Sequence, residues 1–277
     1  MAKNAVDKVK GFFRIGMLAF VLLMSRPFTG FAQQTDLCGL SNTSFKTGEK
    51  ITYKVFYNMS MIWVAAGIAN FTVYDEKLDG KDVFHIVGDG KTLKSYEWFY
   101  KVNDKYETWL DKETMLPLKF YRNVSEGDIQ FNSIAKFDHN TQRIYTANKT
   151  FSAPKCIQDV LSTIYYARNV DYNKYKPGAT IPFSMFLDDK VYNLYIKYLG
   201  KEKIKTKYGT FNTIKIKPLL ISGTIFKDGD KMTVWVTDDA NHIPVRVDSP
   251  ILIGSIKVDL MSYSNLRSPM TALIKKK

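Results

Sequence analysis

The chain has 277 residues, and 40 Lys and Arg against 27 Asp and Glu give it a formal net charge of +13. Most of this charge is Lys, whereas specific phosphate and base recognition relies on the planar Arg fork. Only five arginines follow residue 32, which argues against nucleic acid as a partner. Anionic envelope polymers or lipid headgroups remain candidates, because a positive field attracts them.

Residues 1–32 are typical of a cleaved secretory signal. A basic start precedes an apolar run over residues 15–24, then Pro27 and Gly30, with small residues before a cleavage site after Ala32. The run is too short for a transmembrane helix, which needs about 20 apolar residues. An uncleaved anchor is the alternative. We expect a periplasmic or secreted protein with no transmembrane span in the mature chain.

Two cysteines remain after the signal, Cys38 and Cys156. In an oxidising compartment an even pair favours a disulfide. This bond would close a loop of more than a hundred residues and tie the start of the mature chain to a helix. The alternative is a reactive thiol, although neither cysteine has a His or a cluster of ligands near it in the sequence.

Strand signals dominate the mature chain. Alternation over residues 51–57 places Ile51, Tyr53, Val55 and Tyr57 on one face. The same pattern recurs over residues 192–198, 214–217 and 256–260. Asp-Gly and Glu-Gly dipeptides between such segments indicate the turns of an antiparallel meander.

One segment has helical periodicity. Residues 154–169 place apolar side chains on a single helix face, with Ser152 and Pro154 as start signals. The members of this face are Ile157, Val160, Leu161, Ile164 and Tyr165.

The mature chain repeats a pattern at an offset of 127–130 residues. An aromatic-Lys-x-Gly-x-x-Ile-x-aromatic motif occurs at 45–53 and 175–183, and a Trp followed by Asp and by Pro-aliphatic-basic occurs from Trp109 and from Trp235. We therefore expect a mainly β fold of two similar antiparallel β-meander or half-barrel lobes with one helix between them. The predicted parts are a signal peptide (1–32), an N-terminal β lobe (33–152), a connecting helix (153–170), a C-terminal β lobe (171–265) and a basic tail (266–277). We expect the last three lysines of this tail, residues 275–277, to be disordered.

Signals for a reaction are weak. The three histidines, His85, His139 and His242, have no metal-ligand spacing. Asp238 and Asp239 could bind a cation, but their place between two strand patterns favours a hairpin loop. The sequence contains no Gly-x-Ser-x-Gly elbow, P-loop or Gly-rich dinucleotide loop. We expect no catalytic residue, metal or cofactor.

Two acids lie in aromatic surroundings, Glu97 and Glu107. A glycan-acting hydrolase would need one of them in a cleft within about 5–10 Å of a second carboxylate. The sequence does not place such a partner, so the enzyme question stays open, with a non-catalytic role preferred.

Aromatic residues supply the best clue to a ligand. Residues 95–100 include four aromatic side chains, and residues 59–66 are apolar on both strand faces. Either the helix and the other lobe cover these strands, or the strands line an apolar groove. The candidate ligand-binding residues are Trp63, Tyr96, Trp98, Tyr100, Trp109 and Trp235.

With these motifs, the chain resembles the uncharacterised bacterial domain-of-unknown-function family 3108, in its Bacteroidetes-like form. The matching segments lie at residues 38–40, 48–53, 62–67, 99–102, 159–168, 234–239 and 254–257. The resemblance implies an exported β-rich protein of the Gram-negative envelope, and it supplies no catalytic residue. Its plan is similar to the open half-barrels of lipoprotein carriers, which is a likeness of fold only.

Our leading hypothesis is a non-catalytic periplasmic protein that binds an apolar or amphipathic envelope ligand, such as a lipid, lipoprotein or polymer. The second is a structural or assembly factor that docks an envelope protein through its aromatic face. The hydrolase built on Glu97 or Glu107 is the third.

Overall fold

The computed structural model describes residues 38–59, 62–98, 100–219, 231–250 and 254–276. The chain divides into Met1–Gln34 and Thr35–Lys277, and the account below concerns the second unit. The predicted signal and its cleavage site after Ala32 lie outside the described residues.

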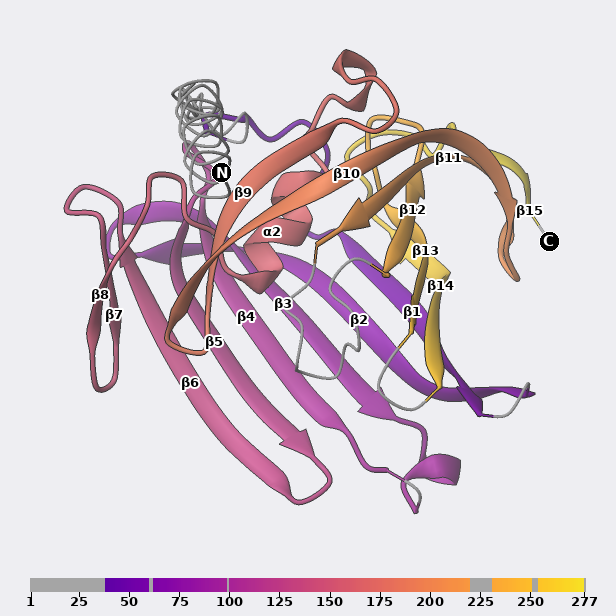
Figure 1. Ribbon diagram of the computed structural model, residues 1–277, viewed down its shortest axis with the longest axis horizontal. Coiled ribbons are helices and arrows are strands. Elements are labelled where there is room, and N and C mark those ends of the chain that lie inside the picture. Colours follow the sequence, from indigo (N-terminus) through magenta and orange to yellow (C-terminus); the bar gives the residue numbers. More distant parts are fainter. Residues whose placement is uncertain (1–37, 60–61, 99, 220–230, 251–253, 277) are drawn as a thin grey trace, which may run out of the picture. The chain divides into compact units, whose positions relative to one another are not determined.

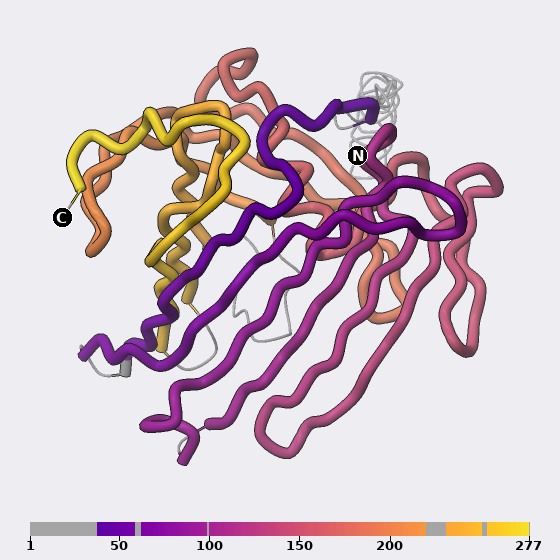
Figure 2. Tube along the Cα trace, turned by 180° about the vertical axis from the view of Figure 1, so that it is seen from behind, coloured from indigo at the N-terminus to yellow at the C-terminus, as the bar shows by residue number. Residues whose placement is uncertain are grey.

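The described strands form one large antiparallel sheet built from two successive meanders (Figures 1 and 2). The first contains β1 (Lys50–Met59), β2 (Ile62–Leu78), β3 (Lys81–Thr92), β4 (Asn103–Asp111), β5 (Pro117–Glu126), β6 (Ile129–Asp138), β7 (Arg143–Thr146) and β8 (Thr150–Ser152). The second contains β9 (Thr180–Leu187), β10 (Lys190–Lys205), β11 (Gly209–Pro218), β12 (Thr233–Thr237), β13 (Pro244–Pro250) and β14 (Ser255–Ser264).

The first and last strands of these meanders join them. β1 pairs with β14 over most of its length, from Lys50 opposite Ser264 to Asn58 opposite Ser255. The sequence predicts two lobes, and the structure has two meanders that share one continuous ladder. Among the described strands, β8 and β9 are the two ends of the sheet and do not pair with each other, so the sheet is open.

Helix α2 (Val160–Ala167) lies between the two meanders and contacts β4 and β9 (Figure 1). Its buried residues Tyr165 and Tyr166 pack in one core with side chains of both meanders, including Ile86 of β3 and Ile181 of β9. A close approach favours glycine beneath the helix, because a Cβ on Gly88 would lie 3.2 Å from a methyl group of Leu161. Short 3₁₀ turns lie at Lys94–Tyr96 and Tyr172–Lys174.

The helix begins later than the periodicity predicts. Asp159 is the N-cap: its side chain accepts from the Ser162 amide, and the Ser162 hydroxyl accepts from the Asp159 amide. Cys156 has φ of 58°, which a helix interior does not allow, and Gln158 forms a parallel bridge with Met185. The predicted start at residues 152–154 is therefore wrong, although the helix exists.

The predicted disulfide between Cys38 and Cys156 is confirmed, with a Cα–Cα distance of 5.5 Å.

Deeper in the core, Arg168 at the helix C-cap makes two hydrogen bonds, at 2.6 and 2.8 Å, with the Glu49 carboxylate. Both side chains are buried, with exposed fractions of 3% and 0%. Burial alone would lower the pKa of Arg168, but the charge of Glu49 and the hydrogen bonds to it together raise that pKa.

The structure also corrects the prediction for the C-terminal segment. Residues 275–277 of the basic tail are predicted to be disordered, yet β15 (Leu273–Lys276) pairs with β11 and includes two of these lysines. The pairing needs a residue without a side chain opposite it, because a Cβ on Gly209 would lie 2.4 Å from the Lys275 carbonyl oxygen. Contacts with the rest of the molecule thus order a segment whose local composition favours disorder.

Candidate functional site

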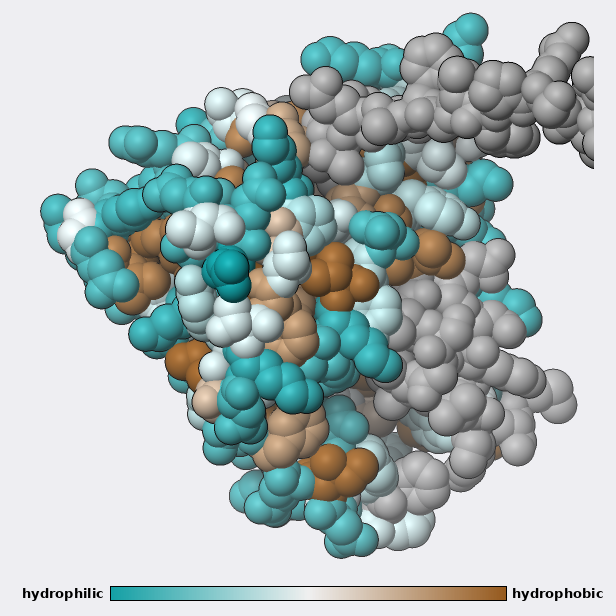
Figure 3. Space-filling model, turned by 60° about the vertical axis from the view of Figure 1, so that its left-hand side comes forward, coloured by the Kyte–Doolittle hydropathy of each residue, from teal (hydrophilic) through white to brown (hydrophobic). Residues whose placement is uncertain are grey.

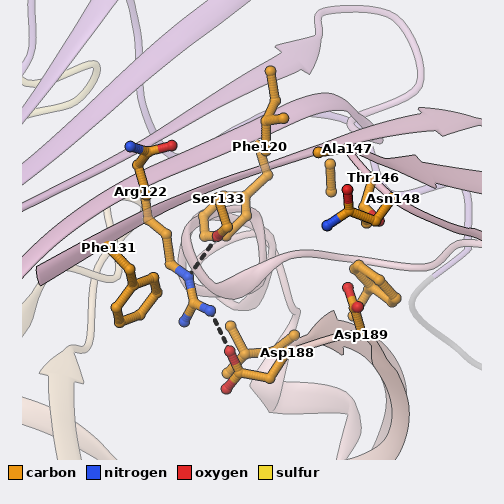
Figure 4. A pocket seen from close by; sticks show the side chains of 14 residues that line it. Phe120, Arg122, Phe131, Ser133, Thr146, Ala147, Asn148, Asp188 and Asp189 are labelled. Atoms are coloured by element: carbon orange, nitrogen blue, oxygen red, sulfur yellow. Dashed lines mark hydrogen bonds and ion pairs between the residues drawn. The ribbon is translucent and has the colours of Figure 1, made fainter.

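A pocket of about 380 Å³ lies between two parts of the sheet (Figure 4). β5, β6 and the β7–β8 turn line it from the first meander, and the end of β9 with the β9–β10 turn lines it from the second. Phe120 of β5 and Phe186 of β9 are almost fully buried and belong to the packed cluster under the pocket. Phe131 of β6 adds an apolar wall and keeps 40% of its surface exposed. This volume is within the range of small-molecule sites, about 300–1,000 Å³.

Among the described residues that line the pocket, Arg122 of β5 is the one basic residue. Its Nε donates to the Ser133 hydroxyl at 2.8 Å, and its Nη2 pairs with the Asp188 carboxylate. The guanidinium also lies over the Phe131 ring, 4.8 Å from the centroid. Since Arg122 is buried and already has a counter-charge, it orders the wall and leaves little positive charge for an incoming anion.

The turn between β9 and β10 supplies the opposite wall. Asp188 and Asp189 are its two central residues, with φ of 50° and 58°. A two-residue turn with positive φ at both positions is the type I′ hairpin turn, which favours Asn and Gly and tolerates Asp. Positive φ at two aspartates is less favourable than at Asn or Gly. The turn nevertheless places both carboxylates, each about half exposed, at the edge of the pocket.

Most of the remaining polar groups at the rim can accept hydrogen bonds. Asn148 from the β7–β8 turn lines the pocket with the two aspartates. Lys149 lies 4.0 Å from Asp189 across the rim. The pocket therefore combines an aromatic floor with a rim rich in oxygen acceptors, which suits a ligand that has an apolar part and a part with hydroxyl or ammonium donors.

A second polar cluster lies on the face of the sheet that points away from α2. Phe84 and Ile86 of β3 pack toward the helix, so His85 between them points to the other face. Its Nδ1 lies 2.7 Å from Glu76 Oε2 and its Nε2 lies 2.8 Å from Glu107 Oε2. Carboxylates only accept, so both contacts are satisfied together when both ring nitrogens carry hydrogen.

Trp109 covers this histidine. The two rings are stacked at 4.4 Å, and the indole Nε1 donates to Glu76 Oε2 at 3.1 Å. Burial alone would raise the pKa of Glu107, but hydrogen bonds from Lys105 and His85 lower it. Both ring nitrogens of His85 and both carboxylate oxygens of Glu107 have a partner within hydrogen-bond distance, so the arrangement is that of a stabilising network.

A pair of acids, Asp104 and Glu126, lies at the ends of β4 and β5. Burial, followed by a hydrogen bond with Asp104, raises the pKa of Glu126 to about 7. Asp104 also accepts from the Ser125 amide at 2.8 Å. Tyr100 packs beside them against the β5–β6 turn, 3.2 Å from where a Cβ on Gly127 would lie.

The structure separates the six aromatic residues predicted to bind a ligand. Tyr96, Trp98 and Tyr100 lie in the connection between β3 and β4, where Trp98 is 82% exposed. Trp63 lies in β2 with Lys257 over its ring, Trp109 lies in the His85 cluster, and Trp235 lies in β12. None of these six described residues lines the pocket, and their role in ligand binding stays a prediction.

The remaining predicted residues have structural surroundings. Glu97 is exposed, and Glu107 shares His85 with Glu76. The ring nitrogens of His139 and His242 contact the carbonyl oxygens of Pro117 and Arg168, both at 2.7 Å. Asp238 and Asp239 form the predicted loop between β12 and β13. In the part of the chain that the structure describes, no three His, Cys, Asp or Glu residues are placed to hold a metal.

The sequence alone did not reveal the pocket. Its lining comes from β5, β6, the β7–β8 turn and the β9–β10 turn, and only Asp188 and Asp189 carry a local signal, that of a turn. Arg122 resembles any other basic residue in an alternating strand, because the fold alone brings it to Asp188.

The sequence profile of the family described as protein of unknown function DUF3108 matches residues 52–261, which is most of the chain. The chain belongs to the DUF3108 family. The expected resemblance is thereby confirmed, and membership in this family assigns no activity to any residue. The comparison with curated proteins gave no match.

Among solved structures, the chain is similar to a β-barrel-like protein of the family DUF1849 from Brucella abortus, with a TM-score of 0.50 and 8% identity over 80% of this chain and 99% of that one. This likeness concerns the fold alone. A candidate lipoprotein from Parabacteroides distasonis (TM-score 0.35, 13% identity, 81% and 100% of the chains) and a candidate exported protein from Bacteroides fragilis (0.32, 11%, 80% and 98%) are weaker matches that carry no argument.

No helix in the described residues could span a bilayer, since the longest of them, α2, has eight residues.

Proposed function

We propose that this protein works outside the cytoplasm and binds an amphipathic ligand in the pocket between β5, β6 and the β9–β10 turn. The observation that carries the proposal is the combination of an aromatic floor and an acceptor-rich rim around a volume of about 380 Å³. The apolar part of the ligand would lie against Phe120, Phe131 and Phe186. Its polar part would donate to Asp188 and Asp189. An anionic head is less suited, because Asp188 already neutralises the charge of Arg122.

The compartment is part of the same proposal. Residues 1–32 have the pattern of a signal cleaved after Ala32, and the Cys38–Cys156 bond suits an oxidising compartment. Together they support the periplasm or the exterior as the location. The ligand class then narrows to lipids, glycolipids and lipid-modified chains of the cell envelope.

We also propose that the two meanders are similar halves that arose by duplication. In β4, the Trp109 indole donates to Glu76 of β2, and in β12 the Trp235 indole donates to Glu202 of β10. In both strands the ladder shifts register directly after the Trp. The pocket is then a difference between the halves, because it forms where the first meander meets the β9–β10 turn.

Calorimetric titration of the mature chain with an alkyl maltoside below its micelle concentration tests the ligand proposal. An alkanoate of the same chain length is the comparison ligand. We expect the maltoside to bind more tightly, since its head offers donors to the rim. Phe131→Ala should weaken maltoside binding about five- to tenfold, the loss expected for uncovering much of an aromatic contact.

Ile129→Ala is the matched control. Ile129 lies on the same face of β6, two residues away, is 57% exposed and does not line the pocket. Equal weakening by both substitutions, or tighter binding of the alkanoate, would contradict the proposal.

A further inference from the structure

Exposed hydrophobic side chains gather at one end of the first meander. Among the described residues, the three most exposed large ones are Trp98, Ile62 and Ile129, with exposed fractions of 82%, 67% and 57%. Trp63 and Tyr100 are exposed at the same end. We call the surface that these five side chains form the apolar end. Single exposed apolar residues are ordinary, whereas several at one place indicate an interaction surface.

Three separate connections contribute to the apolar end. Ile62 opens β2 after β1, Trp98 lies between β3 and β4, and Ile129 opens β6 after β5. Alternate connections of an antiparallel meander lie at the same end of the sheet, which is the lower end in Figure 1. Backbone hydrogen bonds also join the β3–β4 connection to β2 on one side and to the β5–β6 turn on the other. The three connections therefore form one surface, and Figure 3 shows hydrophobic residues exposed among hydrophilic ones near the bottom of its view.

The opposite end of the same meander is different. Its connections are residues 79–80, 112–116 and 139–142. None of the large hydrophobic side chains that are exposed in the described residues lies in these connections, and Met115, which does lie there, is fully buried. Exposure of apolar residues is therefore specific to one end of the sheet and is not a general property of its turns.

We propose that the apolar end inserts into the headgroup layer of a lipid bilayer. Trp and Tyr favour this layer, because the ring is apolar and its N–H or O–H can reach water or a headgroup. The most exposed side chains project from three different connections. A fluid bilayer receives each of them without a preformed pocket, whereas a protein partner would need a matching pocket for each anchor.

The polar groups of the apolar end suit the same layer. The Trp98 indole N–H donates to the Ser95 carbonyl oxygen at 3.0 Å, so this polar atom would enter the layer with a partner. The Lys257 ammonium lies over the Trp63 ring, 4.0 Å from its centroid. A long Lys side chain beside an inserted ring can reach the lipid phosphates.

Charge favours a bilayer that contains anionic lipids. The chain has a net charge of +13, and such a field attracts an anionic surface. At the apolar end itself, the exposed Lys94 and Lys101 are offset by the exposed Glu97 and Asp128. We therefore expect insertion of apolar side chains to supply most of the binding, and lipid charge to supply a smaller part.

The apolar end continues toward the pocket, and this step rests on the proposed function. Ile129 and Phe131 are two residues apart in β6 and share one face of the strand. Phe131 also lines the pocket. A bilayer that holds the apolar end would thus lie close to the site that binds an amphipathic lipid.

Co-sedimentation of the mature chain with lipid vesicles tests the docking. We expect partition onto vesicles of phosphatidylcholine, and somewhat stronger partition when they also contain phosphatidylglycerol. Trp98→Ala should weaken partition about tenfold and Ile129→Ala about threefold, because each removes apolar surface that the bilayer covers. Ile274→Ala is the matched control and should leave partition unchanged. Ile274 is 49% exposed but lies in β15, beside the start of β11.

Circular dichroism and the thermal unfolding midpoint check that each variant is folded. A wild-type chain that partitions onto neither vesicle composition would overturn the proposal. So would equal weakening by Ile129→Ala and Ile274→Ala, or partition that Trp98→Ala leaves unchanged. Titration with the maltoside separates this proposal from the pocket: a chain that binds the maltoside but no vesicle contradicts only the docking. Partition onto vesicles without maltoside binding contradicts only the pocket and supports the docking.

Discussion

Arg168 and Glu49 connect three parts of the chain at one point. Arg168 ends α2, Glu49 precedes β1, and the guanidinium also donates to the carbonyl oxygens of Ser44 and Asn241. The polar contacts of the Arg168 guanidinium are all buried, so water cannot replace a contact that a substitution removes. A buried pair of this kind is costly to form, and it is much more costly to leave half of it without a counter-charge.

We therefore expect Glu49→Gln to lower the free energy of unfolding by about 3–5 kcal/mol. Urea unfolding followed by circular dichroism measures this change. Asp75→Asn removes the carboxylate of the more exposed pair with Lys112 and should cost less than about 1 kcal/mol. Similar losses of unfolding free energy from the two substitutions would contradict the expectation that the buried Arg168 contacts stabilise the fold more than the exposed pair.

Asp159 gives the stability of the protein a pH dependence. Its carboxyl is fully buried, and burial raises the pKa from 3.8 to about 6 in spite of hydrogen bonds from Thr108 and Ser162. The folded state then holds a proton that the unfolded state releases. Stability from this group is present below about pH 4 and is lost as the pH rises through about 6, by up to about 3 kcal/mol.

Asp159→Asn should remove this part of the pH profile. The Asn carbonyl oxygen can still accept from the Ser162 amide, and its amide can donate to the Thr108 hydroxyl, so the helix cap is kept. Unfolding midpoints at a series of pH values test the expectation. Asp171→Asn, at the more exposed N-cap of the second 3₁₀ turn, is the control and should keep the wild-type profile. An unchanged profile in Asp159→Asn would contradict the assignment.

At the scale of single elements, strands were easier to predict than the helix ends. Alternation fixed the face of Ile51 and Tyr53, which are buried in β1, because period two is a local property. The start of α2 depends on the disulfide at Cys156 and on the bridge from Gln158 to β9. The strand at Leu273–Lys276 depends on Gly209, more than sixty residues away. Such contacts leave no local pattern.

The disulfide belongs to this scale because it joins the N-terminal segment to the entry of α2. The two cysteines are 118 residues apart, and in the chain-entropy model a loop of this length contributes about 4–5 kcal/mol. We expect a reductant to lower the urea midpoint of the wild type accordingly. The Cys38→Ser/Cys156→Ser double variant should start at the lower midpoint and not respond to reductant. A wild type that is insensitive to complete reduction would contradict this estimate.

At the scale of the whole molecule, the fold class and the order of strands within each meander follow from the sequence. The pairing of β1 with β14 does not, because nothing in either strand names a partner about 200 residues away. The pocket is unpredictable for the same reason. Its floor, its arginine and its two aspartates come from β5, β6, β9 and the β9–β10 turn. These elements come together only in the folded chain.

The central claim is that this meeting place binds an amphipathic ligand. The most direct measurement is mapping of backbone amide chemical shifts in an isotope-labelled mature chain during titration with an alkyl maltoside. The account predicts saturable changes at residues 131–135, 146–148 and 186–189, with little change in the exposed connection around Trp98. Changes confined to Tyr96, Trp98 and Tyr100, or no saturable change at the pocket, would contradict it.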